Sequence, residues 1–198
     1  MITQLATLKK RLKIRDEDVV DDELLTRIID ATYARFEKEC NRKLARQAAA
    51  TFEFRANVVH ILVDRYPIES VTTFELKSNE TDGWEAEVVD YLLTPSRAMI
   101  EFASEFGSDT QIGRVTFTGG FVMPGTDPGA GQTALPDDLE DAAIEQIAYW
   151  YRNKDKLGLS SVSGQSGSIA FEPKSVVNPL PLLAPVQAVL KSYTRMIM

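Results

Sequence analysis

Apolar and polar residues follow a helical period at both ends of the chain and a strand period between them. Apolar residues at spacings of three and four predict helices over 3–13, 22–43 and 136–156. The last of these is apolar around most of its circumference. Five of its charged residues gather on one narrow strip: Asp137, Asp141, Glu145, Arg152 and Asp155. Because so broad an apolar surface has to be covered by other elements, we expect 136–156 to be the central core helix.

Start and stop signals bound the predicted helices. Thr3 is the expected cap of the first helix. Pro136 suits the first helical position of the third, and the carboxylates after it favour the positive end of the helix dipole. Lys154 lies in the expected last turn, and Gly158 can adopt the left-handed conformation that closes a helix.

Between 48 and 121 the period changes to two, which indicates strands. Six segments show this pattern: Thr51–Phe54, Val58–Val63, Val71–Leu76, Trp84–Leu93, Met99–Phe102 and Arg114–Phe121. Six short strands between helices predict an α+β fold. We expect an N-terminal helical hairpin, an antiparallel β meander or small barrel-like sheet, a central C-terminal helix and a flexible apolar tail.

The residues after the central helix differ in character. We assign 1–158 to one domain, 159–177 to a flexible Ser/Gly-rich linker and 178–198 to a C-terminal partner-docking segment. One side of that segment is apolar, formed by Leu183, Val186, Val189, Leu190 and Tyr193. We expect this side to dock as a helix in a groove of a partner. The alternative is that the segment folds back on the chain's own sheet.

Composition narrows the function classes. A net charge of −7 and a pI near 4.9 argue against binding DNA by broad phosphate neutralisation, although they allow a protein that encloses DNA. The basic cluster Lys9–Lys13 is interpreted as a solvated helix face. Cys40 is the only cysteine, which excludes an intrachain disulfide, and we expect it to be a small apolar helix residue. No stretch reaches the length of a membrane-spanning helix, so we expect no membrane partner.

The sequence offers no catalytic constellation. His60 is the only histidine and lies in a predicted strand, where it lacks the partners that acid–base chemistry needs. One histidine and one cysteine make a zinc site unusual, and the acidic groups lack the spacing of a calcium loop. We therefore expect no enzyme activity, no metal and no cofactor.

Four motifs occur in a fixed order along the chain. A short leucine helix and an acidic turn precede a helix ending at Asn41–Arg42, and RYPIESVTTFEL follows with a strand-initiating Pro67. VTFTGGF at 115–121 ends the strand region, and LPDDLEDAAIEQIAYWYRNKD forms the central helix. Together these motifs resemble the head–tail connector family of tailed phages, also called adaptor or head-completion proteins. The resemblance covers Met1 to Lys156 and, loosely, the tail.

The resemblance implies a structural adaptor that forms a ring of about twelve copies beneath the phage portal. Such a ring extends the DNA channel and joins capsid to tail. The implied partners are the portal protein, a stopper or tail-side neck protein and other copies of the chain, while DNA passes without specific binding. The implied location is the virion neck, with the host cytoplasm during assembly.

Two alternatives remain open. One is another neck or tail-completion ring protein, a stopper or tail terminator, which we expect to be mostly β. The other is a small hydrolase, which needs a polar constellation that one histidine and one cysteine do not supply.

Overall fold

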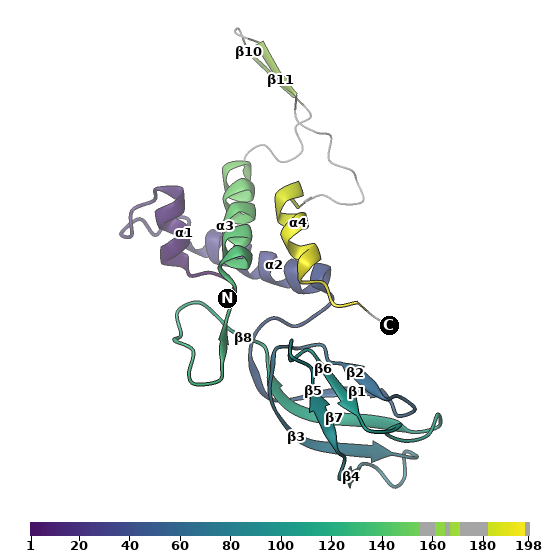
Figure 1. The fold of residues 1–198 in the computed structure, drawn as a ribbon. Helices are drawn as coiled ribbons and strands as arrows, with labels where there is room; N and C mark the ends of the chain where they lie inside the picture. The colour runs from purple at the N-terminus through teal and green to yellow at the C-terminus, as the bar shows by residue number, and fades with distance from the viewer. Residues whose placement is uncertain (155–160, 165–166, 171–181, 197–198) are drawn as a thin grey trace. The chain divides into compact units, whose positions relative to one another are not determined.

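The computed structural model describes residues 1–154, 161–164, 167–170 and 182–196. The chain divides into two compact units. We call them the helical unit, Met1–Phe36 with Pro136–Tyr193, and the sheet unit, Glu37–Leu135 with Thr194–Met198. The predicted α+β class is confirmed, with N-terminal helices, sheets and a central helix (Figure 1).

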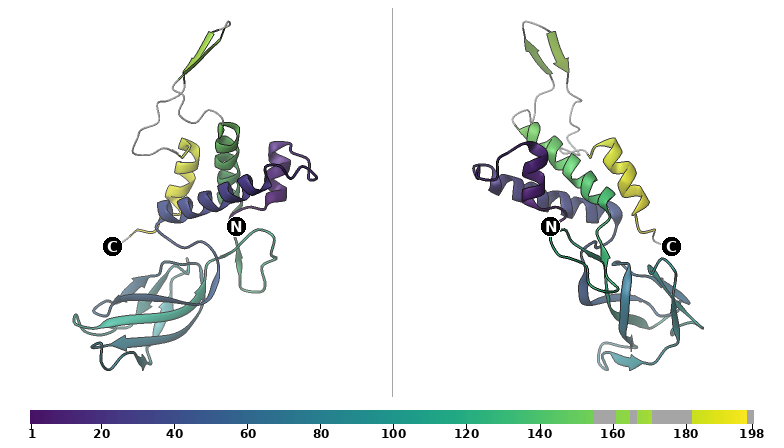
Figure 2. Two further views of the ribbon diagram at one scale, coloured as in Figure 1. Left: turned by 180° about the vertical axis from the view of Figure 1, so that it is seen from behind. Right: turned by 60° about the vertical axis from the view of Figure 1, so that its left-hand side comes forward.

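Helices form the helical unit. They are α1 (Leu5–Leu12), α2 (Asp22–Cys40, which runs on into the sheet unit), α3 (Asp137–Arg152) and α4 (Ala184–Ser192). Helices α1, α3 and α4 lie side by side, and α2 runs across one side of them (Figures 1 and 2). Helix α3 contacts both α1 and α4, so its central position within this unit agrees with the prediction.

Helix α3 has the two-sided character that its sequence predicts. Its buried residues are Leu139, Ala142, Ala143, Ile144, Gln146, Ile147 and Ala148. The charged strip is exposed at Asp137, Asp141, Glu145 and Arg152, whereas Asp155 and Gly158 lie outside the described residues. Three carboxylates occupy its first turn, where they face the positive end of the helix dipole.

The first helix departs from the prediction in two ways. Thr3 does not cap it; its hydroxyl donates to Glu140 Oε1 at 2.8 Å, and Gln4 occupies the cap position. Lys9 is not solvated but only 4% exposed, with Nζ 2.7 Å from Asp22 Oδ1. Lys9 follows Leu8 on the packed side of the helix, and its long side chain reaches a carboxylate from there. The rest of the predicted basic cluster is exposed.

An ion-pair and hydrogen-bond network joins the start of α2 to the end of α3. The Tyr151 hydroxyl and Lys154 Nζ both donate to Asp21 Oδ2, the latter at 2.9 Å. The hydrogen bond from Tyr151, followed by that from Lys154, holds the pKa of the Asp21 carboxyl below its usual value. The network favours the ionised carboxylate in the folded chain.

We expect this network to lose its stabilising effect in acid. A folded-state pKa below the unfolded value gives stability that is present above the unfolded pKa and lost as pH falls through the folded one. In urea titrations between about pH 3 and 7, Asp21→Asn should therefore flatten the acid-side loss of stability. Asp30→Asn, an exposed change in α2, is the control. An unchanged pH profile for Asp21→Asn would refute this role.

Two antiparallel sheets make up most of the sheet unit. The first has the order β1-β7-β3-β4, with β1 (Gln47–Arg55), β3 (Ile68–Lys77), β4 (Glu85–Glu87) and β7 (Ile112–Gly119). The second has the order β2-β6-β5, with β2 (His60–Leu62), β5 (Tyr91–Leu93) and β6 (Met99–Phe102). A short parallel pair, β8 (Phe121–Val122) and β9 (Thr133–Ala134), follows.

Residues of both sheets share one core. Phe74 of the first sheet lies edge-on to Tyr91 and Phe102 of the second, with ring centroids 5.3 and 5.5 Å apart. Strand β7 alternates buried and half-buried residues along its length, as its sequence predicts. Because β7 inserts between β1 and β3, the first sheet is not a meander. The two sheets are separate and face each other as in a small sandwich, so the antiparallel sheets are confirmed but not a barrel.

Two predicted segments differ in the structure. The expected strand Trp84–Leu93 is divided into β4 and β5, which belong to different sheets, and the fully exposed Val88 lies between them. Within the expected linker 159–177, β10 (Ser161–Gly164) and β11 (Gly167–Ala170) pair as an antiparallel hairpin. A composition rich in serine and glycine predicts a linker, and the few apolar residues of these strands give no clear alternation in the sequence.

Candidate functional site

Helix α4 carries the residues predicted to dock on a partner, and it lies antiparallel on α3. The backbone N–H of Leu183, before α4, donates to Gln146 Oε1 in the second half of α3 at 2.8 Å. The hydroxyl of Tyr193, at the end of α4, donates to Asp138 Oδ1 at the start of α3 at 2.7 Å. Two polar anchors thus fix the direction of α4 on α3.

The predicted docking residues share one side of α4, and the chain itself uses that side. Val186 is 0% and Leu190 3% exposed, while Leu183, Val189 and Tyr193 are half-buried. The tail therefore folds back on a helix, whereas the alternative from the sequence named the sheet. Docking on a partner through these five residues stays a prediction, and it requires α4 to expose a side that this structure buries.

The chain after α4 is held within the sheet unit by Arg195. Its backbone N–H donates to the Cys40 carbonyl at 2.8 Å, and its guanidinium Nη2 donates to the Leu62 carbonyl at 2.7 Å. The guanidinium lies 5.1 Å from the ring centre of Phe52. No local sequence pattern predicts this contact, because it joins residues that are far apart along the chain.

Cys40 is fully buried, as expected of a small apolar helix residue. Burial raises the pKa of its thiol to about 11, so the thiol is protonated at neutral pH. His60 is exposed on β2. Within the described ranges, no three His, Cys, Asp or Glu side chains are grouped so that they could hold a metal ion.

Three of the four sequence motifs meet in one place, which we call the motif junction: Arg42, Tyr66, Gly119, Gly120 and Phe121. The guanidinium of Arg42 lies 3.3 Å from the ring centre of Tyr66 and 5.1 Å from that of Phe121, and it donates to the Tyr66 carbonyl. Arg42 is only 4% exposed. Stacking and a charge-assisted hydrogen bond stabilise this buried cation.

The two glycines of the junction allow close backbone approach. Gly120 has φ +100°, and a Cβ there would lie 2.7 Å from the Ala45 carbonyl oxygen. A Cβ on Gly119 would lie 2.9 Å from the Pro67 carbonyl oxygen. Two backbone hydrogen bonds lie beside this close approach. The Gly120 N–H donates to the Pro67 carbonyl at 3.0 Å, and the Phe121 N–H donates to the Leu44 carbonyl at 2.8 Å. The junction therefore joins three chain segments through backbone contacts that a side chain would disturb.

We expect Gly120→Ala to destabilise the sheet unit by about 2–4 kcal/mol, because backbone strain and a clash with backbone atoms add. Gly83→Ala is the matched control, since Gly83 also has positive φ (+76°) but nothing within 4 Å of a Cβ. Its cost should be only the strain of about 1–2 kcal/mol. Urea denaturation measures both, and equal losses for the two variants would contradict the close approach.

The structure reveals opposite charges on two helices of the helical unit. Asp137, Asp141 and Glu145 are exposed on α3, and Lys10 and Arg11 are exposed on α1. Large apolar side chains are also exposed, including Val20 at 88% in the turn between α1 and α2.

No helix among the described residues has the length and apolar character needed to cross a membrane.

Residues 2–82 match the family described as Phage gp6-like head-tail connector protein. These residues include the N-terminal helices and the RYPIES segment, whereas VTFTGGF and α3 lie beyond them. The resemblance that the four motifs indicate is thereby confirmed. No curated protein matches the chain.

Solved structures of gene transfer agent (GTA) particles contain similar chains. One is from the neck of an empty GTA particle computed with C6 symmetry, with a TM-score of 0.59 and 17% identity, covering 100% of this chain and 91% of that one. One is from the virion of a native particle, with a TM-score of 0.57, 18% identity and coverages of 100% and 91%. A third is from the neck of a native particle computed with C12 symmetry, with a TM-score of 0.55, 17% identity and coverages of 98% and 89%. At these identities the likeness shows the fold.

Proposed function

We propose that this protein is a structural, non-enzymatic adaptor of a phage neck. It forms a ring of about twelve copies beneath the portal, extends the DNA channel and joins the capsid to the tail. The match of residues 2–82 to head–tail connector proteins is the observation that carries this proposal. The structural likeness to chains from particle necks, computed with C6 and C12 symmetry, supports a ring.

The helical unit favours the adaptor over a stopper or tail terminator. We expect those components to be mostly β, whereas helices α1, α3 and α4 form a unit of this chain with its own buried core. The proposed partners are the portal on one side and a stopper or tail-side neck protein on the other. The proposed location is the virion neck, which the protein reaches from the host cytoplasm during assembly.

Electron microscopy of the purified protein mixed with its portal tests the proposal. We expect a continuous ring seated on the portal. Individual portals without added density would contradict the adaptor function, and density found only on tail-side components would favour the stopper or terminator alternative.

We expect the purified protein not to retain duplex DNA in a gel shift at about 0.15 M salt, because its net charge of −7 repels phosphate. Lys10→Glu/Arg11→Glu is the comparison variant, and it should likewise leave the migration of the DNA unchanged. Tight binding that weakens steeply with salt would contradict passage of DNA without adhesion, and its loss in the variant would locate the binding on α1.

A further inference from the structure

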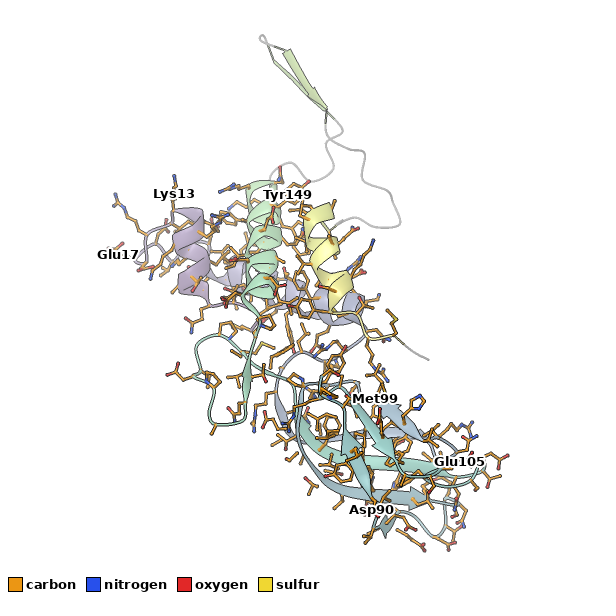
Figure 3. All side chains as sticks on the ribbon, in the orientation of Figure 1. Lys13, Glu17, Asp90, Met99, Glu105 and Tyr149 are labelled. Carbon is orange, nitrogen blue, oxygen red and sulfur yellow. The ribbon has the colours of Figure 1, made fainter. Side chains whose placement is uncertain are left out.

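An unpaired acidic row lies along the exposed side of α3. Asp137, Asp141 and Glu145 recur every four residues, so they stack on one side of the helix. We call these three residues the α3 acidic strip. None of their carboxylates has an ion-pair partner among the residues that the structure describes. Tyr149 continues the spacing and is 41% exposed at the end of the row (Figure 3).

An unpaired basic group lies on α1 of the same unit. Lys10, Arg11 and Lys13 are exposed, and we call them the α1 basic patch. Leu8 and Lys9 are the buried residues of α1. At helical spacing Lys10 projects from the side opposite them, and Arg11 from the flank of the helix. In the part of the chain described, these three cations also have no ion-pair partner.

The patch and the strip do not pair within one chain. Helix α1 contacts α3, and its buried residues are Leu8 and Lys9 rather than members of the basic patch. The basic patch is exposed, and the turn after it carries the carboxylates of Asp16, Glu17 and Asp18. Each copy therefore presents two exposed surfaces of opposite charge that do not pair with each other among the described residues.

We infer that the α1 basic patch of one copy binds the α3 acidic strip of the next copy in the ring. This inference rests on the proposed function, since a closed ring needs a contact between two different surfaces of each copy. Copies with a net charge of −7 repel one another, so adjacent subunits need local contacts of opposite charge. Tyr149 adds an aromatic ring on which an arginine can stack.

Two charge-reversal variants test this contact. Lys10→Glu/Arg11→Glu makes both surfaces acidic, and Asp141→Lys/Glu145→Lys makes both basic. Either variant alone places like charges across every contact, and we expect at least about tenfold weaker ring formation on the portal by electron microscopy. Mixed in equal amounts, the two variants should form alternating rings, because each acidic surface then meets a basic one.

The mixture separates this contact from folding and from the proposed function. Recovery of rings in the mixture shows that both variants fold. Glu23→Lys/Asp30→Lys, which reverses exposed charges of α2, is a separate control and should form rings as the unaltered protein does. If the unaltered protein forms rings and either reversal alone leaves them intact, the contact is wrong although the proposed function stands. Failure of the mixture to recover also overturns the contact. If the unaltered protein forms no ring, both proposals fail. If the mixture forms complexes of only two copies, the two surfaces form a dimer contact, and the proposed ring contact is overturned.

Discussion

Ile147→Asp should unfold the helical unit. Ile147 is 0% exposed in α3, the helix that contacts both α1 and α4. The change removes a buried side chain and puts a carboxylate in its place with no partner, a loss on the order of 4 kcal/mol or more. Such a loss is a large share of the stability of a typical domain.

Circular dichroism during thermal unfolding measures this effect. Two matched variants accompany it: Ile147→Val, expected to cost about 0.5–1.5 kcal/mol, and Glu145→Gln on the exposed side of the same helix, expected to cost little. A melting curve of Ile147→Asp that overlays that of the unaltered protein would show that α3 is not the core helix of its unit.

Removing the chain after Asn178 should also destabilise the helical unit. The truncation deletes α4 and exposes the side of α3 on which it packs. Leu182, Val186 and Leu190 are each less than 10% exposed, and burial of such side chains contributes about 1.5–3 kcal/mol apiece. The expected loss is therefore on the order of 5 kcal/mol, accompanied by aggregation through the exposed apolar surface.

Leu190→Ala separates packing from the gross effect of truncation. It should cost about 2–5 kcal/mol in urea denaturation, while Lys191→Ala, next to it and exposed, should cost little. A truncated chain that keeps its melting temperature would contradict the packing of α4 and would restore the view of the tail as a segment free to dock.

Local patterns predicted most of the elements. The spacing of apolar residues identified α1, α2 and α3 to within a few residues, and the period of two over Arg114–Phe121 identified β7. Each of these signals arises within a single element, where the side chains of neighbouring positions determine which face is buried. The exposed strip of α3 was predicted for the same reason.

Contacts between distant segments were not predictable from these patterns. The sequence could not show that β7 inserts between β1 and β3, because strand order depends on pairing rather than on period. It also could not show that Lys9 reaches Asp22, or that Arg195 returns to the Leu62 carbonyl. The apolar side of α4 was recognised from the sequence, but the surface that covers it, α3 of the same chain, was not.

The mass of the complex between this protein and its portal tests the central claim most directly. Each chain has a mass of 22.1 kDa, so a ring of about twelve copies adds about 265 kDa to the portal. Native mass spectrometry or mass photometry should show this single step with no stable species between the bare portal and the completed ring. A portal whose mass does not change, or one that gains only one or two chains at saturation, would contradict the adaptor ring.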